Sequence, residues 1–326
     1  GFVLLAAMPS RSLVVLVGAL LVVAGLPLVA RAMGKGTAMM GVVLAVGAGS
    51  GLWFERGPCE WETTYFCASI EVPADNPNGR VLWLDTFRNS YVDLVDPTYL
   101  EFRYSQVVAD VLALRPEGPL HGAYVGGGGF TVPRYVEAVR PGSSSVVFEI
   151  DGELVELVER ELGLVISEDL RVEVGDARLY LPDEPDGSFD YILGDAFNGL
   201  SVPWHLTTRE FLWEIDRALS DDGVYLMNLL DYPPLGFARA EMATFLDVFE
   251  HVAIVSTFTR LSGERGGNYV LVGSKAPIEW DELQARIIER DAIDYVMAGA
   301  EPAGFADGAR VLRDDFAPVD QLISGP

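Results

Sequence analysis

Glycine or carboxylate residues stand at the ends of four short apolar segments of the chain. They are, in order, Gly126, Gly127, Gly128, Gly129, Glu149, Asp176 and Asp195. Consecutive glycines let a ligand approach the backbone closely and leave its N–H groups accessible. A carboxylate can accept hydrogen bonds from ribose hydroxyls or an exocyclic amine, and it can take a proton from a reacting group. Together these residue types predict a nucleoside site with a base beside it.

The spacing suggests a separate role for each acid. Glu149 lies 23 residues after Gly126, near the ~20-residue interval between the glycine loop and the ribose-binding acid of nucleotide folds. We predict that Glu149 binds the ribose, that Asp176 accepts the adenine amine, and that Asp195 lies where the group is transferred. Phe130 follows the glycines where a GxGxxG motif needs a small residue. This departure disfavours a dinucleotide dehydrogenase and favours an S-adenosylmethionine-type nucleoside site.

From His121 onward the chain repeats a strand–loop–helix rhythm, which predicts an α/β, Rossmann-like fold with a mostly parallel sheet. The predicted strands are 122–125, 145–150, 170–174, 189–193, 224–230 and a final pair, 251–256 and 268–274. In open sheets of this kind ligands bind beyond the carboxyl ends of the strands. Each acid alone could equally cap a helix or form a turn. Their occurrence at successive strand ends favours a site.

The charge balance limits the kinds of partner. Lys and Arg number 23 against 48 Asp and Glu, a net charge of −25, which repels nucleic acid and is compatible with a small cationic amine substrate. His121, His205 and His251 are isolated in the sequence and only two cysteines are present, so we expect no metal. Cys59 and Cys67 could form a disulfide or remain two thiols; the sequence leaves both open.

Two long apolar runs lie near the amino terminus. Ser12–Ala30 and Thr37–Phe54 are uncharged, and each approaches the ~20 residues that a membrane-spanning helix needs. We predict transmembrane segments at about 12–30 and 37–54 in a multi-pass membrane protein, with its large domain on the cytoplasmic side because a nucleoside donor is supplied there. The alternative is a buried helical hairpin. Because the first residue is Gly1 and Phe2–Met8 is apolar, we expect the chain to begin inside a longer hydrophobic segment.

Three regions are expected along the chain. Residues 1–54 form the predicted membrane segments, 55–118 a small β-rich domain, and 119–326 the Rossmann-like nucleoside domain. Within the second region, 70–85 reads as strand, NPNG turn and strand, a β-hairpin.

An ordered set of motifs resembles the spermidine synthase family. The motifs are WLDTFRNSY (83–91), GGGG (126–129), FEID (148–151), VGDAR (174–178), YILGDAF (191–197), GNYVLVGSK (267–275) and LRDDFAPVDQL (312–322). The similarity extends from about residue 58 to the end and is strongest to the bacterial membrane-fused branch. It implies a class I S-adenosylmethionine-dependent-transferase-like fold with a small N-terminal β-domain and gatekeeping segment, preceded by transmembrane helices; a homodimer is compatible with it.

The resemblance also implies an activity. The family transfers an aminopropyl group from decarboxylated S-adenosylmethionine to a diamine, without a metal, and needs a carboxylate to orient the amine and take its proton. By position, Glu149 and Asp176 match the ribose and adenine acids and Asp195 the catalytic acid. Asn89 stands where the family has a cofactor-contacting glutamine, and Tyr99 matches a tyrosine of the amine site.

Two positions depart from the family pattern. Gly129 stands where the family has an aspartate that holds the amine of the donor, and Asn198 stands where it has a second acid of the substrate site. Each change removes a charge-assisted hydrogen bond, typically ~1.5–3 kcal/mol. Two alternatives therefore stay open: an S-adenosylmethionine-dependent methyltransferase, and a non-catalytic nucleoside-binding domain fused to a transporter-like membrane part.

Overall fold

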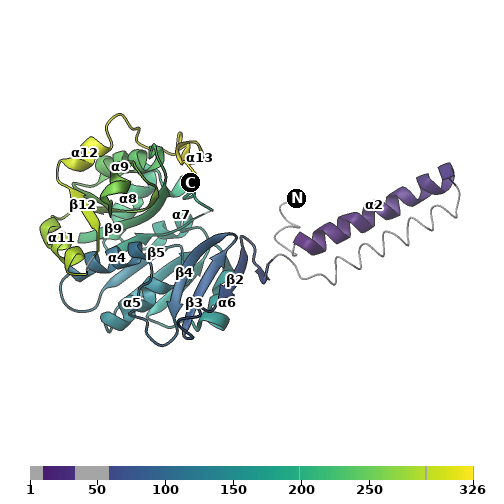
Figure 1. The fold of residues 1–326 in the computed structure, drawn as a ribbon, viewed down its shortest axis with the longest axis horizontal. Coiled ribbons are helices and arrows are strands. Elements are labelled where there is room, and N and C mark those ends of the chain that lie inside the picture. Colours follow the sequence, from purple (N-terminus) through teal and green to yellow (C-terminus); the bar gives the residue numbers. More distant parts are fainter. Residues whose placement is uncertain (1–9, 34–58, 198, 291, 326) are drawn as a thin grey trace. The chain divides into compact units, whose positions relative to one another are not determined.

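The computed structural model describes residues 10–33, 59–197, 199–290 and 292–325 (Figure 1). The chain divides into two compact units, the first comprising 1–71 and 83–88, the second 72–82 and 89–326. All the described site residues that the sequence predicts belong to the second unit.

The first unit holds the helix α2 (Ser10–Met33) and the strands β1 (Trp61–Glu62) and β2 (Cys67–Glu71), which pair antiparallel. Cys59 and Cys67 form a disulfide, which settles the alternative that the sequence left open. The strands β3 (Gly79–Leu84) and β4 (Phe87–Asp93) follow, and the four strands make one sheet in the order β1-β2-β3-β4.

The predicted localisation in a membrane is contradicted by the structure. Among the described residues, no helix combines the length and the apolar character that crossing a bilayer requires. The second predicted segment, 37–54, lies outside the described residues. The prediction of a multi-pass protein with a cytoplasmic domain is corrected accordingly.

The second unit is built on an eight-stranded sheet in the order β12-β10-β11-β9-β8-β5-β6-β7. Its strands are β5 (His121–Val125), β6 (Ser144–Glu149), β7 (Leu170–Val174), β8 (Phe189–Gly194), β9 (Leu219–Asp231), β10 (His251–Thr257), β11 (Gly267–Ser274) and β12 (Asp294–Ala298). The strands from β5 to β9 run parallel, whereas β11, β10 and β12 continue the sheet antiparallel. The predicted α/β, mostly parallel, Rossmann-like fold is confirmed.

The strand β12 was missing from the sequence prediction, which ended the sheet with a final pair. This short strand pairs with β10 and lies at the end of the sheet order. Its five residues alternate between buried and exposed only at their start, so they carry little of the period-2 signal by which a strand is predicted.

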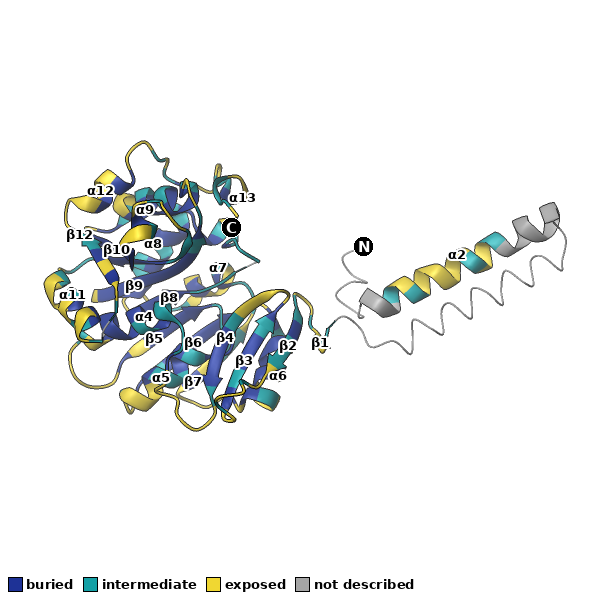
Figure 2. Cartoon of the chain, viewed as in Figure 1, coloured by how far each residue is buried: buried dark blue, intermediate teal, exposed yellow. Residues whose placement is uncertain are grey.

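Helices follow most of the strands. They are α4 (Arg103–Ala113), α5 (Thr131–Val139), α6 (Gly152–Leu162), α7 (Ala177–Tyr180), α8 (Arg209–Ala218), α9 (Gly236–Val248), α10 (Phe258–Leu261), α11 (Trp280–Glu289), α12 (Glu301–Phe305) and α13 (Val319–Leu322), with the 3₁₀ turns η1 (Leu181–Asp183) and η2 (Trp204–Leu206). The helix α9 packs against α8, α12 and α13, and α4 packs against α11. The strands between them are largely buried (Figure 2).

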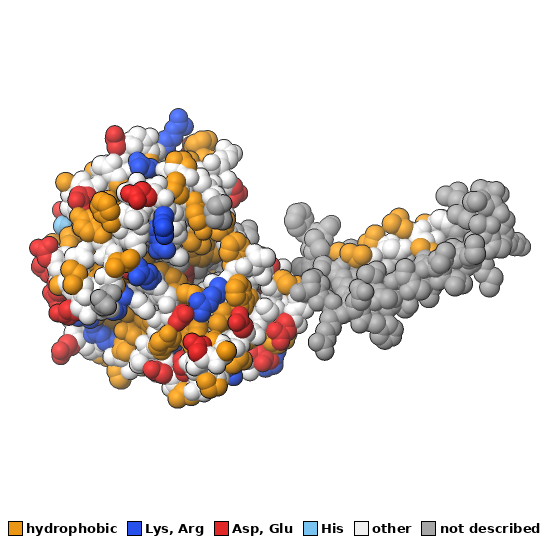
Figure 3. Space-filling model, viewed as in Figure 1, with side chains coloured by type: hydrophobic (Ala, Val, Ile, Leu, Met, Phe, Trp, Pro, Cys, Tyr) orange, Lys and Arg blue, Asp and Glu red, His pale blue; other side chains and the backbone are white. Residues whose placement is uncertain are grey.

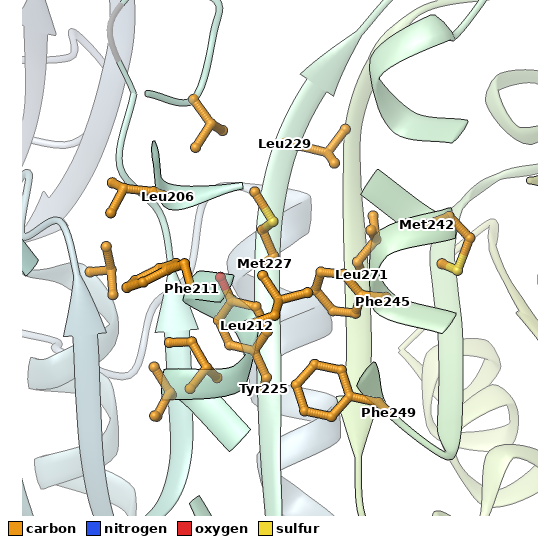
Figure 4. Packing of buried hydrophobic residues seen from close by; sticks show 14 of the residues in the cluster. Leu206, Phe211, Leu212, Tyr225, Met227, Leu229, Met242, Phe245, Phe249 and Leu271 are labelled. Atoms are coloured by element: carbon orange, nitrogen blue, oxygen red, sulfur yellow. The ribbon is translucent and has the colours of Figure 1, made fainter. Parts of the chain in front are cut away.

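The main core lies between the sheet and the pair α8 and α9 (Figure 4). Tyr225 on β9 stacks on Phe245 of α9 with ring centroids 5.3 Å apart, and Phe249 packs beside both. Burying large aromatic side chains stabilises this layer by ~1.5–3 kcal/mol each. The sheet is thereby fixed in position and its carboxyl edge becomes a rigid support for side chains.

Asp231, at the end of β9, ties together the start of α9 and the carboxyl-terminal segment. Its fully buried carboxylate accepts the N–H groups of Tyr232, Phe237, Ala238 and Ser324 at 2.8, 3.0, 2.9 and 3.2 Å. The first turn of a helix leaves such N–H groups without intrahelical partners, and the carboxylate satisfies two of them.

We expect Asp231→Asn to lower the free energy of unfolding by about 2–3 kcal/mol, because the amide places N–H groups against backbone N–H groups. Denaturant titration measures this change, with the exposed Asp221→Asn as the control. Equal stability of the two variants would contradict the assigned role.

Candidate active site

The register of the parallel strands brings the predicted residues to one edge of the sheet. Val125 pairs with Phe148 on one side and with Gly194 on the other. Gly126 N–H then donates to the carbonyl of Phe148, and Asp195 N–H donates to the carbonyl of Val125, each at 2.9 Å. The residues that come next after Val125, Phe148 and Gly194 are Gly126, Glu149 and Asp195, which therefore lie side by side.

The carboxylate of Glu149 accepts hydrogen bonds from the backbone of the glycine loop. One carboxylate oxygen accepts the N–H groups of Gly127 at 2.7 Å and Gly128 at 3.4 Å, and the other accepts that of Asp151 at 3.0 Å. Burial raises the pKa of Glu149, and these three N–H groups oppose the rise. A carboxylate has about four lone-pair positions, so one acceptor position remains for a hydroxyl of a ligand.

The loop needs glycine for steric reasons. Gly126 and Gly128 have φ angles of +95° and +48°, which residues with a side chain rarely adopt. A Cβ on Gly126 would lie 2.8 Å from the carbonyl oxygen of Asp195, and one on Gly128 would lie 2.7 Å from Oδ1 of Asn89. The glycines thus permit close contact of the loop with Asp195 and with Asn89 of β4.

Asn89 and Ser90 of β4 close the far end of the loop. Gly129 N–H donates to Ser90 Oγ at 2.9 Å, and the Ser90 hydroxyl donates to Asn89 Oδ1 at 2.6 Å. A Cβ on Gly129 would lie 2.7 Å from Ser90 Cβ. The family's aspartate has no room at position 129, because β4 occupies that space.

Asp195 is held by hydrogen bonds to both oxygens. The hydroxyl of Tyr104 on α4 donates to Oδ2 at 2.9 Å, and Asn228 Nδ2 on β9 donates to Oδ1 at 2.8 Å. Asn268 on β11 donates in turn to the amide oxygen of Asn228 at 2.9 Å. Three elements therefore fix the orientation of one carboxylate.

The surroundings of Asp195 raise the pKa of its carboxyl group. Burial raises its pKa to about 7, and the hydrogen bonds from Asn228 and Tyr104 act against that rise. Burial and the neighbouring carboxylate raise the pKa of Tyr104 well above its usual value, so this phenol stays a hydrogen-bond donor. A carboxylate with a pKa near neutrality is suited to accept a proton from a reacting amine.

Asp176 begins the helix α7 and pairs with a histidine. Its Oδ1 accepts the N–H of Arg178 at 2.9 Å, and His205 Nε2 lies 3.1 Å from Oδ2. The carboxylate of Asp176 is partly exposed, so it remains accessible to a ligand at the sheet edge.

Tyr99 makes its described contacts with Glu101 and Tyr91. The hydroxyl of Tyr99 donates to Glu101 at 2.6 Å, and this hydrogen bond, first among several causes, raises the pKa of Tyr99 to about 12. The Tyr99 side chain is exposed and packs edge-on against Tyr91. Asn198 lies outside the described residues.

Sequence reasoning did not identify five residues that hold the site acids or the glycine loop, directly or through another side chain: Ser90, Tyr104, His205, Asn228 and Asn268. One signal was available, because Asn228 is the single polar residue in the run VYLMNLL (224–230). A buried amide in an apolar strand needs a hydrogen-bond partner, which here is Asp195. Tyr104 had no such signal, since its contact spans 91 positions of sequence.

We expect Asn228→Leu to raise the pKa of Asp195 above about 7, because the substitution removes a donor that favours the charged carboxylate. Difference infrared titration of the carboxyl band, with Asp195→Asn to identify the signal, measures the shift. Asn78→Leu, at an exposed turn, serves as the control. An unchanged pKa would show that Asn228 does not stabilise the charge.

The sequence of the chain is similar to those of known transferases. No family model matches the chain. The polyamine aminopropyltransferase of Vibrio vulnificus is 30% identical over 233 residues, which cover 68% of this chain and 75% of that protein. The polyamine aminopropyltransferase of Chromobacterium violaceum is 31% identical over 206 residues, or 61% and 75% of the two chains.

Solved structures of spermidine synthases share the fold of this chain. A probable spermidine synthase from Corynebacterium glutamicum superposes with a TM-score of 0.74 at 26% identity, covering 83% of this chain and 100% of that one. A spermidine synthase in complex with the transition-state analogue AdoDATO shares the fold, with a TM-score of 0.54 at 17% identity over 84% and 85%. The chain therefore belongs to the polyamine aminopropyltransferase family and is a transferase.

Proposed function

We propose that the protein transfers an aminopropyl chain from the sulfonium of an S-adenosyl donor to a small amine. Both decarboxylated and intact S-adenosylmethionine carry that sulfonium and that three-carbon chain, the latter with an added carboxylate. The observation that carries the proposal is Asp195, a carboxylate with a pKa of about 7 that is held by Tyr104 and Asn228 beside the glycine loop. Membership of the polyamine aminopropyltransferase family supports an amine as acceptor.

The other acids suit the nucleoside half of the donor. Glu149 would accept a ribose hydroxyl with its remaining acceptor position, and Asp176 would accept the adenine amine from its partly exposed carboxylate. The glycine loop would let the nucleoside lie close to the backbone. Asp195 adjoins the loop through Gly126, so the reacting end of the donor would face the base.

The reaction follows from these positions. A neutral amine attacks the chain carbon next to the sulfonium; the new C–N bond forms as the C–S bond breaks, and sulfur keeps the electron pair. The amine gives up one proton, which Asp195 accepts. Tyr104 and Asn228 each donate one hydrogen bond to this carboxylate, which leaves acceptor positions directed to the amine. Orientation of the amine contributes along with proton transfer.

The neutral Gly129 favours the alternative function of a methyltransferase. The reaction products distinguish the two functions. Aminopropyl-type transfer releases methylthioadenosine, whereas methyl transfer releases S-adenosylhomocysteine. We expect the full chain, given either donor and a series of small diamines, to release methylthioadenosine in an amine-dependent manner, as measured by chromatography. Release of S-adenosylhomocysteine, or no turnover with any amine, would contradict the proposal.

Asp195→Asn tests the proton acceptor. We expect the turnover rate to fall by about 10²–10⁴-fold, while methylthioadenosine still binds, because the amide keeps the shape of the carboxylate without its basicity. Calorimetry measures binding, and Asp221→Asn is the charge-matched control. Retained turnover in Asp195→Asn would exclude this residue as the base.

The pH dependence gives an independent check on the same residue. Asp195 must be deprotonated to accept a proton, so kcat/KM is expected to fall as the pH drops through about 7. Asn228→Leu should move this acidic limb to higher pH, because it raises the pKa of the base. A limb that stays in place would mean that another group titrates.

A further inference from the structure

The helix α4 carries Tyr104, one of the two side chains that hold Asp195, but it has no side-chain cap at its start. Within the described residues, its N-cap Phe102 makes no capping hydrogen bond, and the first turn has no acidic residue. Buried apolar side chains such as Val107 and Val108 pack the helix against the rest of the fold. Because apolar burial is non-directional, these contacts alone do not fix the rotation of the helix as closely as a hydrogen bond to Asp195 requires.

Arg290 links α4 to a distant part of the chain. Its guanidinium donates to the buried carboxylate of Asp110 through Nε at 3.0 Å and Nη2 at 2.6 Å, and to the side-chain oxygen of Gln106 through Nη1 at 2.6 Å. Asp110 and Gln106 are four residues apart on α4, so they share one face of the helix. The amide nitrogen of Gln106 donates in turn to the carbonyl of Leu100 at 2.6 Å, which extends the link to the residues before α4.

A second link joins the same two regions. Arg290 follows the helix α11, and Asp294 begins the strand β12. Oδ1 of the buried Asp294 lies 3.6 Å from Nη1 of Arg103, the first residue of α4. Helix α11 itself packs against α4. Tyr104 therefore stands in the sequence between two side chains, Arg103 and Gln106, that are both held from the same distant region.

Given the proposed function, on which this step depends, we propose that Arg290 is a positioning residue of the reaction. By holding α4 through Asp110 and Gln106, it keeps the hydroxyl of Tyr104 directed at Asp195. An arginine suits this task, because its planar fork has enough donors to bind a carboxylate and an amide oxygen together, whereas a lysine offers a compact point charge.

Difference infrared titration of the Asp195 carboxyl band, identified with Asp195→Asn, tests this link on the full chain without turnover. Tyr104→Phe removes a donor to the charged carboxylate, so it should raise the titration midpoint by on the order of one pH unit. The other donor, Asn228, is unchanged. We expect Arg290→Met to raise the midpoint by at least half as much. Arg290→Lys leaves a positive charge for the buried Asp110, which protects folding, and should give a smaller rise.

Two further variants separate positioning from a general loss of stability. Arg160→Met removes an exposed arginine that pairs with its neighbour Glu161, and it should leave the midpoint as in the wild type. In the double variant Arg290→Met/Tyr104→Phe the midpoint should move no further than in Tyr104→Phe, because the hydroxyl that Arg290 positions is already absent. Wild-type midpoints in both single Arg290 variants, with folding verified by circular dichroism, would overturn the inference.

Turnover distinguishes this inference from the function on which it depends. In Arg290→Met we expect the acidic limb of kcat/KM to move to higher pH with the infrared midpoint, and kcat to fall by about tenfold or more with KM little changed, since a misplaced base slows the reaction. Turnover together with an unmoved midpoint would reject the role of Arg290 alone. A moved midpoint in a protein that turns over no amine would reject the proposed function, while the link from Arg290 to Asp195 would stand.

Discussion

The candidate site depends on the register of four parallel strands. Because Val125 pairs with both Phe148 and Gly194, and Gly194 with Met227, the residues that come next in each strand end at the same edge. A shift by one residue would turn alternate side chains to the opposite face of the sheet. The register is strongly specified, since these strands are buried against the core (Figure 4).

The edge of the sheet combines two environments. Asp195 is desolvated, and its pKa is raised despite two neutral donors, whereas the carboxylate of Asp176 is partly exposed beside His205. The net charge of −25 attracts cationic amines at long range. On the face drawn in Figure 3, acidic side chains are scattered among basic and hydrophobic ones. At the site itself, local hydrogen bonds from Tyr104 and Asn228 hold the Asp195 carboxylate in place.

The loss of an acid at Gly129 becomes intelligible only with β4 in place. In the sequence the glycine is a departure from the family; in the structure it is a steric requirement, because Ser90 fills the space that an acid would need. The residue at this position of the loop is thus constrained by Ser90, which packs on it from a distant part of the chain.

The sequence alone determined the α/β fold, the alternation of strands and helices, and the glycine and acidic residues at the strand ends, because periodicity and local turn chemistry are properties of neighbouring residues. It gave a wrong localisation and missed β12. Only the tertiary structure identified Tyr104, Asn228 and Asn268 as the residues around Asp195, and showed Tyr99 paired with Glu101. The contacts of Tyr104, Asn228 and Asn268 join elements far apart in the chain, and no local pattern encodes them.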